Sequence, residues 1–168
     1  MRILGIDPGY AIVGYGVIEY NLGKFCVLGC GAITTEAHKP FPERLEDIYN
    51  DLSFIIDKYK PDAFSIERLY FNTNTTTAID VAQARGVIVL AAQNKGLEVN
   101  EYTPLQVKQS VTGYGRAEKR QVMEMVKSLL RLNEVPKPDD TADALALAVC
   151  HAHYSASSYS KILKEAKR

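Results

Sequence analysis

Four carboxylates lie in three separate parts of the chain. Asp7 ends an apolar run just before a Pro-Gly turn, Glu67 lies in the segment AFSIERL, and Asp140 and Asp143 lie in DDTADALALA. The last two share one side of a helix, because residues three apart are neighbours on a helix surface. If the chain brings all four together, their mutual repulsion favours a bound divalent cation. Ligands that are all oxygen favour Mg²⁺ or Mn²⁺.

Such a carboxylate cluster predicts phosphodiester chemistry. Two cations about 3.5–4 Å apart can activate water and stabilise the leaving oxygen in hydrolysis. The structural alternative is that Asp7 and Asp140 are turn and cap residues and that Glu67 pairs with a nearby arginine, Arg68 or Arg85. The pattern of residues leaves both interpretations open.

The elements that must position these carboxylates follow from the spacing of apolar residues. Strands are predicted at 2–7, 11–20, 24–34, 63–69 and 97–102, and helices at 42–59, 77–94, 103–111, 118–132 and from 139 onward. Short turns between the first three strands predict an antiparallel meander, whereas the fourth, after a helix, is predicted to lie parallel to the first. The order βββαβαβααα is typical of an α/β fold, a mixed sheet flanked by helices.

Composition bounds the class of protein. The chain has 168 residues, of which 46% are hydrophobic, which predicts one domain over residues 1–154 and a frayed basic tail at 155–168. No apolar run is long enough to cross a membrane and no signal peptide is visible, so we expect a cytoplasmic protein. The three cysteines form no CxxC pair, and we expect them to be buried side chains.

Charge is distributed unevenly, although the formal net charge is zero. Residues 103–132 hold six basic and two acidic side chains. This excess can form one electropositive face on a neutral protein. His151 and His153 are two apart on a predicted helix and point to different faces, so they are not a metal-binding pair.

Five segments occur in order: GIDPG followed by GYGVI, then SIERL, QARGV, QVKQSVTGYGRAEK and DDTADALALA. Together they resemble the RuvC-type Holliday junction resolvases of the ribonuclease H-like superfamily, over residues 2–153. The resemblance implies a mixed five-stranded sheet, a homodimer, and metal-dependent cutting of two opposed strands of a four-way DNA junction in recombination and repair. It also implies a 5′-phosphate product.

The same resemblance assigns the carboxylates. Asp7, Glu67, Asp140 and Asp143 match the family's catalytic, metal-binding positions and are expected to hold two Mg²⁺ ions, for which Mn²⁺ can substitute. Asp139 directly precedes the last pair, so composition alone does not fix the register. The spacing to ADALALA favours Asp140 and Asp143.

The resemblance also implies contacts to DNA. Lys108 and Lys119 match basic residues near the scissile phosphate, and Arg116 and Arg120 lie in the same basic region. An aromatic after the second carboxylate enters the junction in this family. Tyr70 has that position, where phenylalanine is common, and Phe71 lies beside it.

The sequence also suggests partners for the protein and leaves two alternative functions to consider. The alanine-rich helix around Gly86 is the candidate dimer contact, and the resemblance implies branch-migration partners of the RuvA and RuvB type. One alternative is an ATP-binding domain of the actin and sugar-kinase type, which would need a second glycine-rich phosphate loop. The other is a non-catalytic junction-binding module, which would gain nothing from four carboxylates beside a phosphate.

Overall fold

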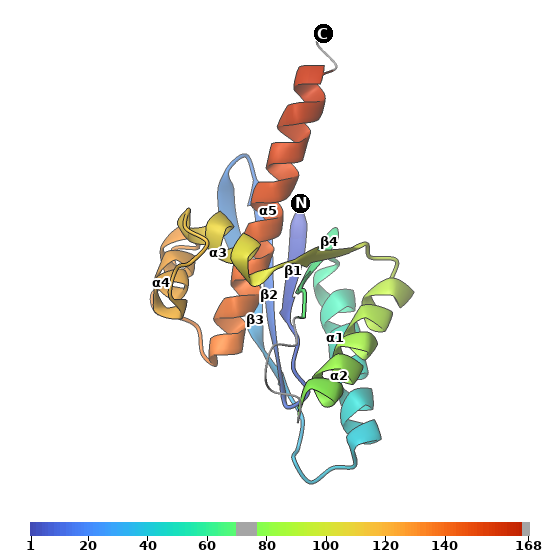
Figure 1. Cartoon of the computed structure of the whole chain (residues 1–168). Coiled ribbons are helices and arrows are strands. Elements are labelled where there is room, and N and C mark those ends of the chain that lie inside the picture. Colours follow the sequence, from blue (N-terminus) through green and yellow to red (C-terminus); the bar gives the residue numbers. More distant parts are fainter. Residues whose placement is uncertain (70–76, 166–168) are drawn as a thin grey trace.

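The computed structural model describes residues 1–69 and 77–165, with side chains up to residue 157 in the last helix. Within these residues the predicted order βββαβαβααα is confirmed (Figure 1). The elements are β1 (Arg2–Asp7), β2 (Ile12–Asn21), β3 (Lys24–Thr34), α1 (Phe41–Tyr59), β4 (Ala63–Glu67), α2 (Ala78–Asn94), β5 (Val99–Tyr102), α3 (Pro104–Thr112), α4 (Lys119–Leu129) and α5 (Asp139–Glu165).

The described strands form one mixed five-stranded sheet in the order β3-β2-β1-β4-β5. β1 and β2 pair antiparallel, as do β2 and β3, which confirms the predicted meander. β4 runs parallel to β1 on one side and to β5 on the other. β1 is therefore the central strand, and its last residue is Asp7.

The sheet separates two apolar cores, because successive side chains of a strand point to opposite faces. Leu4 and Ile6 of β1 pack with α1 and α2, whereas Ile3 packs on the side of α3, α4 and α5. Figure 1 shows the same layers, with α5 crossing one face and α1 and α2 covering the other. Asp7 has the parity of Ile3 and thus belongs to the α5 face.

Helix ends are fixed by local signals that the sequence contains. Thr103 caps α3 and forms a capping box with Gln106, and Pro104 takes the first helical position. α4 begins in the same way, with Glu118 as its cap and Gln121 as the reciprocal partner. These caps fix the start of both helices beside the candidate site.

Glycines in β1 and β2 allow α5 to lie unusually close to the sheet. A Cβ atom on Gly5 would lie 2.1 Å from the carbonyl oxygen of Ala144, and one on Gly14 would lie 1.9 Å from the carbonyl oxygen of Asp140. Any larger residue at either position would force the helix backbone away. The sequence GIDPG…GYG is therefore a packing signal as well as a chemical one.

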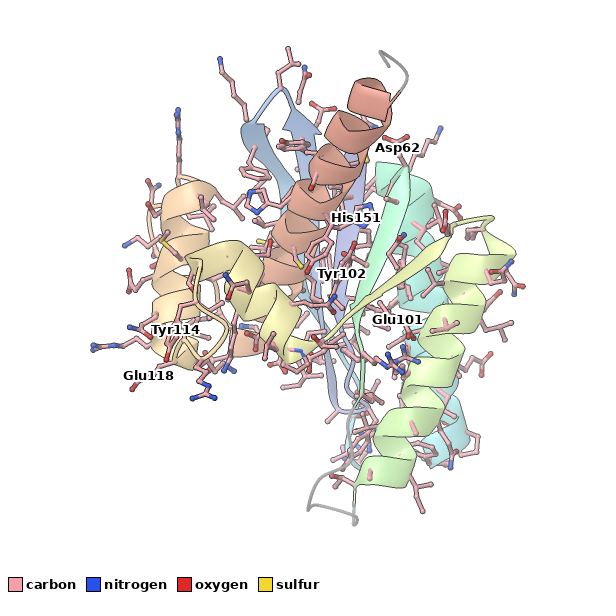
Figure 2. The ribbon with its side chains drawn as sticks, turned by 45° about the horizontal axis from the view of Figure 1, so that its top comes forward. Asp62, Glu101, Tyr102, Tyr114, Glu118 and His151 are labelled. Atoms are coloured by element: carbon pink, nitrogen blue, oxygen red, sulfur yellow. The ribbon has the colours of Figure 1, made fainter. Side chains whose placement is uncertain are left out.

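Tyr102 connects the edge of the sheet to α5. Its hydroxyl lies 2.8 Å from Nδ1 of His151, and both side chains are buried (Figure 2). His153 instead contacts Ser110, with 3.1 Å between Nδ1 and the hydroxyl oxygen. The two histidines thus have different partners, as their separate faces predicted.

One expectation from the sequence is wrong. Cys150 is buried, but Cys26 and Cys30 are exposed, since β3 is an edge strand. α5 itself continues to Glu165 and is therefore longer than its buried first half. No helix in the described part of the chain is long and apolar enough to cross a bilayer.

Candidate active site

Asp7 and Glu67 end two neighbouring parallel strands. Ile6 of β1 lies opposite Ile66 of β4, so the two carboxylates follow this pair directly. Both belong to the α5 face, because Gly5 and Ser65 precede them by two residues and are themselves paired. Strand ends place both carboxylates at one edge of the sheet, on rigid backbone.

Asp140 and Asp143 lie in the first two turns of α5. This part of the helix packs over the edge of the sheet at which Asp7 lies. Asp140 lies over Gly14, and Gly14 is the antiparallel partner of Asp7. Asp143 lines one pocket with Glu67, and its charge raises the pKa of both Asp7 and Glu67, so it lies close to both strand ends. The structure thus brings together all four carboxylates that the sequence indicates.

The electrostatics of the cluster are unfavourable without a cation. Burial, and then the charges of Asp143, Glu67 and Asp140, raise the pKa of Asp7 from 3.8 to about 8. Burial and the charge of Asp143 also raise the pKa of Glu67, and burial raises that of Asp143. A protonated carboxyl at neutral pH is the expected response of crowded, desolvated acids.

Lys119 partly neutralises the cluster. Its Nζ lies 3.1 Å from Oδ2 of Asp143 and 3.4 Å from Oδ2 of Asp139. Asp139 is exposed, whereas Asp140 is among the charges that raise the pKa of Asp7. Sequence reasoning missed the pairing of Asp139 with this lysine, although both residues lie at helix starts.

A pocket of about 200 Å³ opens beside these side chains. Its walls come from β4, α3, α4 and α5, and it is lined by Glu67, Pro104, Val107, Lys108, Lys119, Val122 and Asp143. The charges of Lys108 and Lys119 both lower the pKa of Glu67, so both amines lie within electrostatic reach of the carboxylates. Two of the acids and both lysines therefore line one concavity, together with apolar side chains of α3 and α4.

The donor set fits a hard divalent cation, because it consists of carboxylate oxygens with excess negative charge. No three Asp, Glu, His or Cys side chains of the described residues are already grouped to hold an ion. If these carboxylates hold a cation, they would have to come closer together than they are here, and at neutral pH Asp7 would have to lose its proton.

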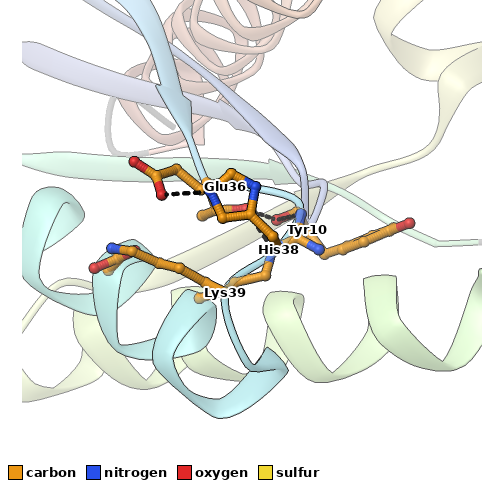
Figure 3. A network of polar contacts seen from close by, with 7 residues as sticks. Tyr10, Glu36, His38 and Lys39 are labelled. Carbon is orange, nitrogen blue, oxygen red and sulfur yellow. Dashed lines mark hydrogen bonds and ion pairs between the residues drawn. The ribbon is translucent and has the colours of Figure 1, made fainter.

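The turn after Asp7 is held by a buried arginine on α1. Arg44 Nε donates to the hydroxyl of Thr35 over 2.8 Å, and that hydroxyl donates to the carbonyl of Tyr10 over 2.7 Å. The guanidinium also lies 4.7 Å from the centre of the Tyr10 ring. Figure 3 shows this network, with His38 paired to Glu36 at its rim. It fixes the loop that carries the chain away from the acidic edge.

Two parts of the structural alternative for the acids do not agree with the geometry, namely the pairing of Glu67 with Arg85 and the placing of Asp7 in a turn. Arg85 forms its ion pair with Glu101, and its Nε donates to the backbone carbonyl of Glu67 rather than to the carboxylate. Asp7 is the last residue of a strand, not a turn residue. Tyr70 and Phe71 lie outside the described residues.

A sheet of this order, with acids at two adjacent strand ends and on a helix packed across them, defines the ribonuclease H-like class of nuclease. The chain belongs to the family of crossover junction endodeoxyribonuclease RuvC, whose family model matches residues 3–151. Membership implies dependence on a divalent metal ion.

Individual relatives agree over nearly the whole chain. The crossover junction endodeoxyribonuclease RuvC of Alkaliphilus metalliredigens is 61% identical over 91% of this chain and 93% of its own. The Thermus thermophilus RuvC structure has a TM-score of 0.87 at 35% identity, covering 94% of this chain and 97% of that one, and the same protein is known in complex with a Holliday junction substrate. The yeast mitochondrial resolvase Ydc2, at 16% identity and a TM-score of 0.67, shares the fold.

Proposed function

We propose that this chain is a homodimeric, Mg²⁺-dependent endonuclease that resolves four-way DNA junctions. It cuts two opposed strands symmetrically during homologous recombination and repair and leaves 5′-phosphates. The observation that carries the proposal is the convergence of Asp7, Glu67, Asp140 and Asp143 at one edge of the sheet. Like charges so placed repel one another and destabilise the fold unless a cation neutralises them. Their convergence is therefore best explained by a metal-binding site.

The four carboxylates are the proposed ligands of two Mg²⁺ ions, for which Mn²⁺ can substitute. Bound there, the ions would supply an activated water and charge stabilisation at the phosphorus. Asp7 is proposed to bind in its ionised form, so it must release the proton that burial and its neighbours favour. The strand ends and the first turn of α5 orient the ligands with little freedom.

Lys108 and Lys119 are the proposed contacts to the scissile phosphate. They line the pocket together with Glu67 and Asp143, so an anion bound there meets two ammonium groups beside the acids. Arg116 and Arg120 extend the positive charge along the connection into α4, and both are exposed. Tyr70 and Phe71 remain proposed aromatic contacts inside the junction.

A dimer through α2 is proposed because that helix carries an exposed apolar stripe. Ile79, Gly86 and Leu90 lie on one side of the helix, since their spacing of seven and four returns to the same face. Ile79 and Leu90 are 67% and 52% exposed, and apart from the neighbouring backbone of α2 itself, no atom of the described residues lies within 4 Å of a Cβ built on Gly86. A two-fold dimer would present two active sites to the two equivalent strands of a junction.

The proposed partners and cellular location follow from the proposed substrate, a four-way DNA junction. Branch-migration proteins of the RuvA and RuvB type, which move such junctions, are the proposed partners, and the cytoplasm is the proposed location. Both alternatives, an ATP-binding domain and a non-catalytic binding module, are disfavoured by membership of a nuclease family. The cluster of acids speaks further against a pure DNA binder.

The deciding experiment incubates the protein and Mg²⁺ with synthetic four-way junctions and, separately, with linear duplexes of the same sequence. We expect paired nicks at symmetric positions in the junction and no cutting of the duplex. Equal cutting of both substrates would contradict junction specificity, and ATP hydrolysis without nicking would contradict the nuclease assignment altogether.

A further inference from the structure

The connection between α3 and α4 presents a large aromatic ring to solvent. Tyr114 is 59% exposed at this connection (Figure 2). Leu105, which is also exposed, lies beneath the neighbouring Gly115, where a Cβ would meet its Cγ at 3.1 Å. A single exposed aromatic is ordinary on a protein surface, so its setting decides whether it matters.

The backbone around Tyr114 is held by an unusually complete set of side-chain hydrogen bonds. Gln109 donates from Nε2 to the carbonyl of Gly113 over 2.7 Å and accepts at Oε1 from the amide of Gly115 over 3.0 Å. Thr112 accepts at its hydroxyl from the Tyr114 amide over 3.1 Å. The loop is therefore built to one shape while the ring itself stays free, which lowers the entropy cost of using it in binding.

Positive charge borders this ring. Arg116 and Arg120 are exposed, and within the part of the chain that the structure describes neither forms an ion pair. Glu118, which lies between the two arginines in the chain, is the N-cap residue of α4, and its amide donates to the side chain of Gln121. Lys119 follows directly and reaches Asp143, so the connection continues into the wall of the catalytic pocket.

We infer that Tyr114 is a DNA-contacting residue that packs its ring against a deoxyribose of the strand whose phosphates meet Arg116 and Lys119. This inference rests on the proposed function and adds to it a second aromatic contact, outside the segment after Glu67. Sugar packing needs an apolar face and no hydroxyl, so phenylalanine should serve as well as tyrosine. The positive side chains hold the phosphates, and the ring fixes the distance of the strand from the pocket.

Binding measurements separate this contact from a charge effect. In an Asp7→Asn background with Mg²⁺, which keeps the junction intact, we expect Tyr114→Ala to weaken junction binding about tenfold and Tyr114→Phe to bind normally. The slope of log affinity against log salt should not change in either variant. Arg116→Ala should instead reduce that slope by roughly 1, because it removes a phosphate contact.

A photo-crosslinking amino acid tests the contact directly. p-Benzoylphenylalanine placed at position 114 should crosslink to junction DNA, whereas the same residue at Phe54, an exposed aromatic of α1 across the sheet, should not. Unchanged affinity of Tyr114→Ala together with absent crosslinking would overturn the inference alone. If the Asp7→Asn protein with Tyr114 intact does not bind the junction, the proposed function itself fails.

Discussion

Asp7 is a buried acid whose surroundings favour its neutral form. Three other carboxylates act on it, and burial excludes the water that would stabilise its charge. Lys119 is the cation that lowers its pKa, and this effect is smaller than the others. Keeping this acid ionised in the free protein therefore costs free energy, a cost that a metal-dependent reaction explains.

The pKa of Asp7 predicts how the metal-free protein responds to pH. A carboxyl with a pKa raised from 3.8 to about 8 keeps a proton in the folded state that the unfolded state releases. The free energy of unfolding should therefore fall as pH rises from about 4 to 8. Glu67 and Asp143 shift in the same direction and add to this fall.

Asp7→Asn should remove the largest part of that dependence. In EDTA at pH 8, we expect the variant to be more stable than the parent by at least ~1.4 kcal/mol, the value of one pKa unit, and the difference should shrink toward pH 4. Urea unfolding at several pH values measures both quantities. Asp139→Asn is the matched control and should lose only a small part of the parent's slope, because Asp139 is the last of the charges that raise the pKa of Asp143. A parent whose stability rises over this range would contradict the account.

At the scale of elements, the position of the site depends on how closely α5 approaches β1 and β2. Gly5 and Gly14 leave the helix backbone almost no clearance. The acids of the helix therefore meet those of the strands only because the strands have no side chains there. Tyr102 and His151 hold the other half of the same interface.

Gly5→Ala should separate the two halves of the site. The new methyl group meets the Ala144 carbonyl, which is backbone and cannot rotate away, so we expect a loss of about 1–3 kcal/mol of stability and a weaker response to Mg²⁺. Thermal unfolding and calorimetric titration measure these effects. Because the main clash is with backbone, adding Ala148→Gly should not restore either quantity; full rescue would show that side-chain packing is the true constraint.

Periodicity and turn signals were sufficient to predict the elements. The pattern of residues left two interpretations of the acids open, and only the resemblance to a family singled out the four that the structure brings close together. The position of β3 at the sheet edge could not be read from its residues, so the exposure of Cys26 and Cys30 was missed. The hydrogen bond from Arg44 to the carbonyl of Tyr10 was also missed. The two residues are 34 apart in the chain, and no local pattern predicts their contact. Contacts between single side chains that are far apart in the chain could not be predicted from the sequence.

At the scale of the whole molecule, the two faces of the sheet have different proposed roles. The α5 face, with α3 and α4, carries the acids, the lysines and the basic connection. The opposite layer presents the apolar stripe of α2 to solvent. A dimer through α2 would leave both catalytic faces free to contact the same four-way junction.

Gly86→Asp should disrupt that dimer. A charge at the centre of an apolar stripe is costly to bury, so we expect dissociation to monomers at concentrations where the parent is dimeric, seen by sedimentation velocity. Paired cutting should decline more than single nicks. Leu22→Asp, which changes a fully exposed leucine at the β2–β3 turn, is the control and should remain dimeric. A dimer that survives Gly86→Asp would place the interface elsewhere.

The most direct test of the central claim compares five neutralising substitutions in one assay, single-turnover cleavage of a prebound four-way junction in Mg²⁺. Asp7→Asn, Glu67→Gln, Asp140→Asn and Asp143→Asn should each lower the rate by ~10³-fold or more, the rate equivalent of several kcal/mol, while junction binding persists. Asp139→Asn, one residue from the cluster, should stay within about tenfold of the parent. Rapid cleavage by Asp7→Asn or Asp140→Asn, or loss of cleavage in Asp139→Asn alone, would contradict the account.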